Sequence, residues 1–110
     1  MEKLDEYRQH IITALRRYAD VKLPDGAEMA VICDKEQDHY QLMSLGWHGQ
    51  QPWHGCILHL SVKSGKIWIH HDGTESGVAG DLEEMGVLKE DIVLAFHAPY
   101  KRHLTGYAAA

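Results

Sequence analysis

Residues 38–72, DHYQLMSLGWHGQQPWHGCILHLSVKSGKIWIHHD, decide the fold of this chain. Apolar and polar residues alternate through much of this stretch, as they do in β-strands that bury one face. A polar loop at residues 48–51 and the dipeptide Ser64-Gly65, which is typical of a two-residue hairpin, divide the stretch. The expected strands are residues 39–47, 53–63 and 66–72.

The two-residue hairpin also fixes the register of its two strands, because it pairs Lys63 with Lys66. Next come Val62 with Ile67 and Leu60 with Ile69 on one face, then Ser61 with Trp68 and His59 with His70 on the other. The first face is apolar and predicts the core. The second face mixes aromatic, aliphatic and polar groups, which favours a protein interface. The interface candidates on it are Ile57, His59, Trp68 and His70.

Further elements flank the central strands. Apolar residues that recur every three or four positions predict a helix at residues 3–19; they are Leu4, Tyr7, Ile11, Leu15 and Tyr18. Residues 23–26, LPDG, predict a turn after this helix, and residues 27–34 alternate as a first strand. A second helix is expected at residues 75–85, with Thr74 as its N-cap and Gly86 as its stop. Residues 92–96 are apolar and indicate either a short edge strand or a packed extended segment.

Together these elements predict one α+β domain over residues 1–110. Its sheet is expected to be a four-stranded antiparallel meander with an N-terminal helix, a helix after the fourth strand and a packed C-terminal segment. Both helices should pack on one face of the sheet. A chain of 110 residues with 45% apolar and 25% charged residues is long enough for one modest core.

The composition also indicates where the protein acts. No apolar run approaches the roughly 20 residues needed to cross a bilayer, and the N-terminus lacks the apolar segment of a signal peptide. Cys33 and Cys56 lie in apolar strand patterns without metal-type spacing, so both are expected to be reduced core residues. These features predict a cytoplasmic protein.

The net charge of −5 argues against general nucleic-acid binding, which depends on Lys and Arg contacts to phosphates. One basic cluster, with Lys101 and Arg102, lies between two tyrosines. Arg16 and Arg17 would extend it if the first helix lay nearby. These four residues are the candidates for direct DNA contact, and a solvated or salt-bridged tail is the alternative.

Nine histidines make a metal site the next question. His59 and His70, if paired on one sheet face, would suit Zn²⁺ or Cu²⁺, but the sequence fixes no third ligand. A polar pair at a sheet surface or dimer interface is the preferred interpretation. The acidic residues Asp34, Glu36 and Asp38 are interpreted as a solvated turn, because an EF-hand's glycine and final glutamate are missing. With no nucleophile–base pair or nucleotide-binding motif, no enzyme activity, catalytic residue, resident metal or cofactor is predicted.

An ordered set of motifs along nearly the whole chain resembles the XisI family, the fdxN-element excision controlling factors of cyanobacteria. The motifs are LDEYR at residues 4–8, DHYQL at 38–42 followed by Gly46-Trp47, Gly55-Cys56 with His59, GKIWI at 65–69, DGTE at 72–75, KEDIVL at 89–94, and Phe96-His97 with PYKR at 99–102. The chain departs from the family pattern at His70, where Gln is expected, and at Ala95 and Ala98, where Gly and Pro are usual.

The resemblance implies a role in controlling excision of the fdxN element, which the site-specific recombinase XisF removes during heterocyst differentiation. It also implies an XisH-like protein partner. We therefore expect a non-enzymatic accessory factor that acts through such a partner and forms a homodimer, with DNA contacted only indirectly or weakly. Direct DNA binding and a metal-binding module are the alternatives.

Overall fold

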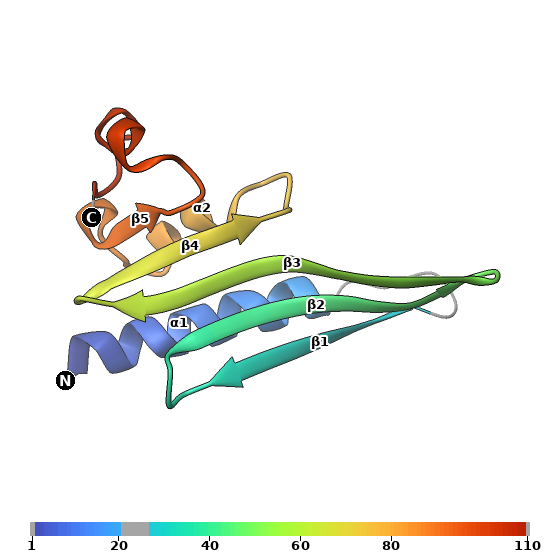
Figure 1. Ribbon diagram of the computed structural model, residues 1–110. Coiled ribbons are helices and arrows are strands. Elements are labelled where there is room, and N and C mark those ends of the chain that lie inside the picture. The colour runs from blue at the N-terminus through green and yellow to red at the C-terminus, as the bar shows by residue number, and fades with distance from the viewer. Residues whose placement is uncertain (1, 21–26, 110) are drawn as a thin grey trace.

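The computed structural model describes residues 2–20 and 27–109, and its elements form a five-stranded sheet with both α-helices against one face (Figure 1). The helices are α1 (Glu2–Ala19) and α2 (Val78–Glu84), with two short 3-10 turns, η1 (Lys89–Asp91) and η2 (Pro99–Leu104). The strands are β1 (Ala27–Asp34), β2 (His39–His48), β3 (Gln51–Lys63), β4 (Lys66–Asp72) and β5 (Ile92–Leu94). The turn predicted at residues 23–26 lies outside the described residues. No helix within the described ranges is long and apolar enough to cross a membrane.

The helix α1 packs on the sheet through the apolar stripe that its sequence predicts. Tyr7, Ile11 and Leu15 are buried, and the end residues Leu4 and Tyr18 are half-buried. The stripe belongs to one core cluster with fully buried strand residues, which are Tyr40, Leu42, Leu58, Leu60, Ile67 and Ile69. Each buried Leu or Ile side chain contributes about 1.5–3 kcal/mol, so this contact layer is the main source of stability.

The sheet order is β1-β2-β3-β4-β5, and the first four strands are antiparallel as predicted. The fifth strand is not part of a meander: β5 lies parallel to β4 and pairs Ile92 with Ile67. The expectation of a purely antiparallel four-stranded sheet is therefore wrong, and the sheet is mixed. The long connection through α2 brings the chain back to the start of β4, which a parallel pair requires.

The two edges of the sheet differ. Beyond β5, Val93 forms a parallel bridge with Ala108 of the C-terminal segment, whose backbone N–H donates to the carbonyl of Ile92 at 2.8 Å. At the other end, β1 pairs with β2 alone among the described strands. The chain therefore covers one edge with its own tail and leaves β1 as an edge strand.

Tight turns join β2 to β3 and β3 to β4. Ser64 and Gly65 both have positive φ, 54° and 77°, as a type I′ hairpin requires, and the predicted register from Lys63–Lys66 to Leu60–Ile69 is confirmed. The loop expected at residues 48–51 is shorter than predicted. His48 pairs with Gln51, so that only Gly49 and Gln50 remain between the strands.

Two β-bulges interrupt the ladders, and the sequence pattern predicts neither. Between β3 and β4 the register shifts after Leu60, so that His59 pairs with His71 and the predicted His59–His70 pair is wrong. Between β2 and β3 a second shift leaves Ile57 without a register partner. Each bulge adds a residue to one strand and re-aims the neighbouring side chains.

The second helix is shorter than predicted, since α2 begins at Val78 with Gly77 as its N-cap. The reason is the Asp72 carboxylate, which accepts hydrogen bonds from the backbone N–H groups of Thr74 and Val78 and holds the intervening residues in a loop. The predicted stop at Gly86 is confirmed. The backbone N–H groups of Gly86 and Val87 bond to the carbonyls of Glu83 and Leu82 in a Schellman arrangement.

Both cysteines are free, as predicted, but neither is a core residue. Cys33 is exposed near the end of β1, and Cys56 is half-buried. Strand alternation indicates which face a side chain occupies, but not whether another element covers that part of the face.

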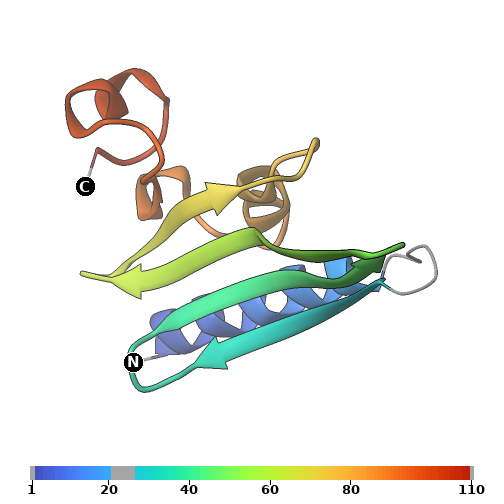
Figure 2. The same cartoon turned by 45° about the vertical axis from the view of Figure 1, so that its right-hand side comes forward.

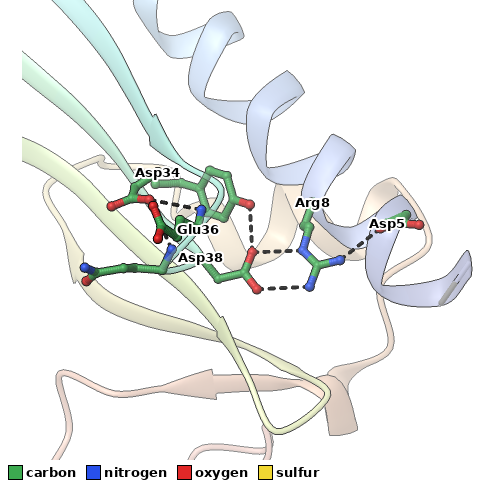
Figure 3. Close-up of polar contacts among 7 residues, drawn as sticks. Asp5, Arg8, Asp34, Glu36 and Asp38 are labelled. Carbon is green, nitrogen blue, oxygen red and sulfur yellow. Dashed lines mark hydrogen bonds and ion pairs between the residues drawn. The ribbon is translucent and has the colours of Figure 1, made fainter.

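Asp38 connects α1 to the strands (Figure 3). Its carboxylate accepts hydrogen bonds from Arg8 Nε at 2.8 Å, Arg8 Nη2 at 2.9 Å and the Tyr40 hydroxyl at 2.9 Å. Its carbonyl accepts the backbone N–H of Val62 at 3.0 Å, and its φ is 59°, a conformation that aspartate tolerates better than most residues. Asp34 and Glu36 are exposed, so the predicted solvated turn describes them but not Asp38.

The charges around Asp38 alter two pKa values. Hydrogen bonding from Arg8 lowers the pKa of the Asp38 carboxyl, and burial together with the bond to Asp38 raises the pKa of Tyr40 to about 12. A carboxyl whose pKa is lowered on folding stabilises the fold at pH values above its unfolded pKa. That contribution is lost as the pH falls through the lower folded pKa.

We expect Asp38→Asn to lower the melting temperature at pH 7, because the neutral amide keeps the left-handed backbone available but loses the ion pair with Arg8. The difference from the wild type should shrink as the pH falls below about 4, where the unfolded chain's carboxyl takes up a proton, and should vanish once the pH is below the lowered folded pKa. Thermal unfolding followed by circular dichroism between pH 3 and pH 7 measures this. Glu36→Gln, the same change of charge in the same turn, is the control and should have little effect. Equal losses in both variants would contradict the assignment.

Leu60→Ala tests the core layer. Leu60 is 0% exposed, so its truncation should cost about 2–5 kcal/mol of unfolding free energy. Leu104→Ala removes the same atoms from a side chain that is 75% exposed, and should stay within about 0.5 kcal/mol of the wild type. Urea denaturation of the three proteins gives both values.

Candidate functional site

The face of the sheet opposite the helices is the candidate site. Both α-helices lie on the other side in each view, so among residues 2–20 and 27–109 no α-helix covers this outer face (Figures 1 and 2). Strand alternation directs to it the residues that lie between the core positions, which include His39, Gln41 and Met43 of β2, Ser61 and His59 of β3, and Trp68 and His70 of β4. Three of these residues are histidines on three adjacent strands.

The three histidines form one cluster. His39 Nδ1 lies 2.9 Å from His59 Nε2, and the ring centroids of His59 and His70 are 4.9 Å apart. The rings of His39 and His70 are stacked with centroids 5.9 Å apart. His59 and His70 are therefore in contact, as their sequence positions predict, although the bulge removes them from direct register.

His39 is a member of the cluster that the sequence pattern did not predict. Its register partner is Ser61, and that of His59 is Gln41, so His39 and His59 are diagonal neighbours across β2 and β3. The sequence feature that indicates His39 is its place as a third histidine, at the start of the strand before β3. Using that signal requires the β2–β3 register, which the bulge at Ile57 makes unreadable from alternation.

Burial and mutual proximity lower the pKa of two of the three histidines, His59 and His70. Burial is the largest cause that lowers the pKa of both His59 and His70, and the positive charge of neighbouring histidines lowers each further. His70 Nε2 also lies 2.8 Å from the hydroxyl of Ser61, which is only 4% exposed. A neutral imidazole offers one N–H donor and one acceptor, so these contacts fix the rings without a full charge.

Trp68 borders the cluster and lies between two cations. Its indole N–H donates to the carbonyl of Lys63 at 3.0 Å. The Lys63 ammonium lies 5.3 Å and the Arg102 guanidinium 5.5 Å from the ring centroid, which are cation–π distances. The predicted interface candidate Trp68 is therefore accessible only in part and is held in one orientation.

Ile57 does not lie with the other three interface candidates. As the bulged residue of β3 it is half-buried and packs against the core cluster, and its carbonyl accepts the backbone N–H of Gly73 at 2.7 Å. The expectation that it faces the outer side is wrong, because a bulge turns two successive side chains towards the same side.

The structure does not bring the basic candidates together. Arg16 and Arg17 are exposed in the last turn of α1, whereas Lys101 and Arg102 belong to η2 at the opposite end of the molecule in both views (Figures 1 and 2). Arg102 donates to the carbonyls of His97 and Ala95, at 3.0 and 3.1 Å, and so holds the C-terminal segment. No continuous basic surface joins these four residues.

Metal coordination finds no support in this geometry. Within residues 2–20 and 27–109, no group of three His, Cys, Asp or Glu side chains is placed to hold a metal ion. In the histidine cluster, Nε2 of His70 lies at hydrogen-bond distance from the Ser61 hydroxyl, and Nε2 of His59 lies at that distance from Nδ1 of His39. These ring nitrogens are therefore occupied by hydrogen bonds within the sheet. His48 and His54, near the turn of the β2–β3 hairpin, are exposed.

Two crystal structures of proteins from Anabaena variabilis have the same fold. A XisI-like protein aligns with a TM-score of 0.92 and 40% identity, covering 97% of this chain and 99% of that one. The fdxN element excision controlling factor XisI aligns with a TM-score of 0.84 and 36% identity, covering 98% of this chain and 99% of that one. The helix-backed mixed sheet is thus that of the XisI-like α+β proteins. No curated protein sequence matches the chain significantly.

The model of the XisI protein family matches residues 1–109. The chain therefore belongs to the XisI family, as its motifs indicated.

We expect the histidine cluster to make the fold sensitive to mild acid. Because the folded pKa values of His59 and His70 lie below the ordinary 6.5, the unfolded chain binds more protons as the pH falls through and below 6.5, and stability declines. His70→Gln should flatten the fall in melting temperature between pH 7 and pH 5. His54→Gln, at an exposed position, should leave the wild-type slope unchanged. An unchanged slope in His70→Gln would contradict the assignment.

Proposed function

We propose that this protein is a non-enzymatic accessory factor that controls site-specific excision of a DNA element of the fdxN type. The observation that carries the proposal is its 36% identity, over 98% of its length, to a protein named as the fdxN element excision controlling factor. The setting that we propose is the cytoplasm of a cyanobacterium during heterocyst differentiation. The protein acts there through a protein partner of the XisH-like class.

The outer face supports a role in partner binding. A sheet normally covers an apolar face with another layer, and here Trp68, Met43 and the histidines lie on a face that neither described α-helix covers. This face is also continuous with the open edge strand β1, where Ile32 is 47% exposed. Such a surface offers both side-chain and backbone contacts to a second protein.

Direct DNA binding is the less favoured alternative. A net charge of −5 repels phosphates at long range, and the basic candidates are divided between two ends of the molecule. Arg102 is already bonded to the backbone, which leaves Lys101 as the exposed cation of its pair. A gel shift at low salt should therefore show no complex between the isolated protein and element-end DNA.

Co-expression with the XisH-like protein of the same genome, followed by mass measurement without DNA, tests the proposal. A complex of defined stoichiometry is the expected result, and the mass of the protein expressed alone tests the homodimer that we also propose. If the two chains do not co-purify, the partner role is wrong.

Trp68→Glu should weaken that complex at least tenfold while leaving the fold intact, because it places a charge on the outer face. Leu88→Glu is the matched control: it introduces the same charge at a side chain that is 49% exposed, on the connection after α2. Circular dichroism checks folding, and titration calorimetry with the purified partner gives the affinities. Equal affinities in the two variants would exclude Trp68 from the interface.

A further inference from the structure

The groups that act electrostatically on His59 and His70, in the histidine cluster of the outer face, are all basic side chains. The groups that act electrostatically on His59 are His39 and His71, and those that act on His70 include His59, His39, Lys63 and Arg102. Every one of these groups is cationic or becomes cationic on protonation. They come from β2, β3, β4 and η2, so groups of this kind act on His59 and His70 from four elements.

Two carboxylates adjoin His39, and the hydrogen bonds of both are made to groups other than the histidine rings. Asp34 is the register partner of His39, but its Oδ1 accepts the backbone N–H groups of Glu36 and Gln37, both at 3.0 Å. Asp38, which interacts electrostatically with His39, binds Arg8 through both carboxylate oxygens. Among residues 2–20 and 27–109, no hydrogen bond or ion pair joins the three histidine rings to a carboxylate.

We propose that this three-histidine face is the docking site for an acidic segment of the partner protein, whose Asp or Glu carboxylates supply the missing negative charge. The inference rests on the proposed function, because it specifies the chemistry of the partner. Charge complementarity favours this occupant. A long polyanion such as DNA is repelled by the net negative charge of the whole chain. A short acidic segment interacts only with the local surface, where Lys63 and Arg102 lie beside Trp68.

Docking of a carboxylate couples binding to protonation. A nearby negative charge favours imidazolium over imidazole, so the segment raises the pKa of the histidines that it contacts and they take up protons on binding. Each proton taken up strengthens the apparent affinity by up to about tenfold per pH unit. A partner that binds only through apolar contacts would show the reverse, because protonation makes the face harder to dehydrate.

The first experiment follows the histidine ring protons of the full-length wild type by NMR as the pH is varied. The probes are a ten-residue glutamate-rich peptide and a matched glutamine-rich peptide. The pKa values of His59 and His70 should rise with the acidic peptide and stay constant with the neutral one. No change with the acidic peptide overturns the inference. A rise with a DNA oligonucleotide and none with the peptide also overturns it, in favour of nucleic acid, and loss of the ring signals through self-association overturns it in favour of a second copy.

The second experiment uses the XisH-like protein itself, titrated between pH 8 and pH 6. Wild type should bind more tightly as the pH falls, by about 3- to 10-fold over that range for one or two protons. The variant His39→Gln/His59→Gln/His70→Gln should lose this dependence, and the control His48→Gln/His54→Gln/His103→Gln, which removes three exposed histidines, should keep it. Tight binding that does not change with pH would overturn the inference and leave the proposed function standing. Absence of any complex would reject the proposed partner and leave the peptide result to decide the chemistry of the face.

Discussion

The ion pair between Arg8 and Asp38 is the constraint on which the layers of this protein depend. It is a two-point contact between the first turns of α1 and the turn that reverses the chain from β1 to β2. Asp38 also binds β2 and β3, because it accepts hydrogen bonds from the Tyr40 hydroxyl and from the Val62 backbone N–H. The hydrophobic core supplies most of the free energy of folding, but it is non-directional. The apolar side chains decide which face of the sheet the helix covers, and the pair at Asp38 fixes where along that face it lies.

Much of this fold follows from local sequence. The stripe of α1, the Ser64-Gly65 hairpin and its register as far as Leu60 depend on neighbouring residues, and they were predicted correctly. The features that were missed depend on distant parts of the chain. The bulge at His70 and the one at Ile57 leave no trace in alternation. The short strand at residues 92–96 was one of two alternatives, but its parallel pairing with β4 was not predicted, because that pairing depends on a distant part of the chain. The start of α2 was missed because the Asp72 side chain competes with helix formation from six residues away.

The candidate site shows the same division. Trp68 was placed correctly from the hairpin register, which a single local turn determines. His59 and His70 meet on the same face, but the bulge removes them from the direct pairing that the register predicted. Ile57 was misplaced and His39 was missed because both depend on the register between β2 and β3, which contains the bulge. The split between the basic residues of α1 and η2 also follows from tertiary structure alone. Charge patterns in a sequence carry no information on which ends of the molecule will meet.

The unequal edges of the sheet have a consequence for how copies of this protein can associate. Backbone pairing can extend the sheet from β1, but the opposite side of β5 is closed by the chain's own tail at Ala108. Strand-to-strand growth of the kind that builds fibrils needs two free edges on every molecule. A molecule with one free edge terminates growth as soon as that edge is used. Shortening the tail before Ala108 would therefore turn a self-limiting particle into one that is able to polymerise.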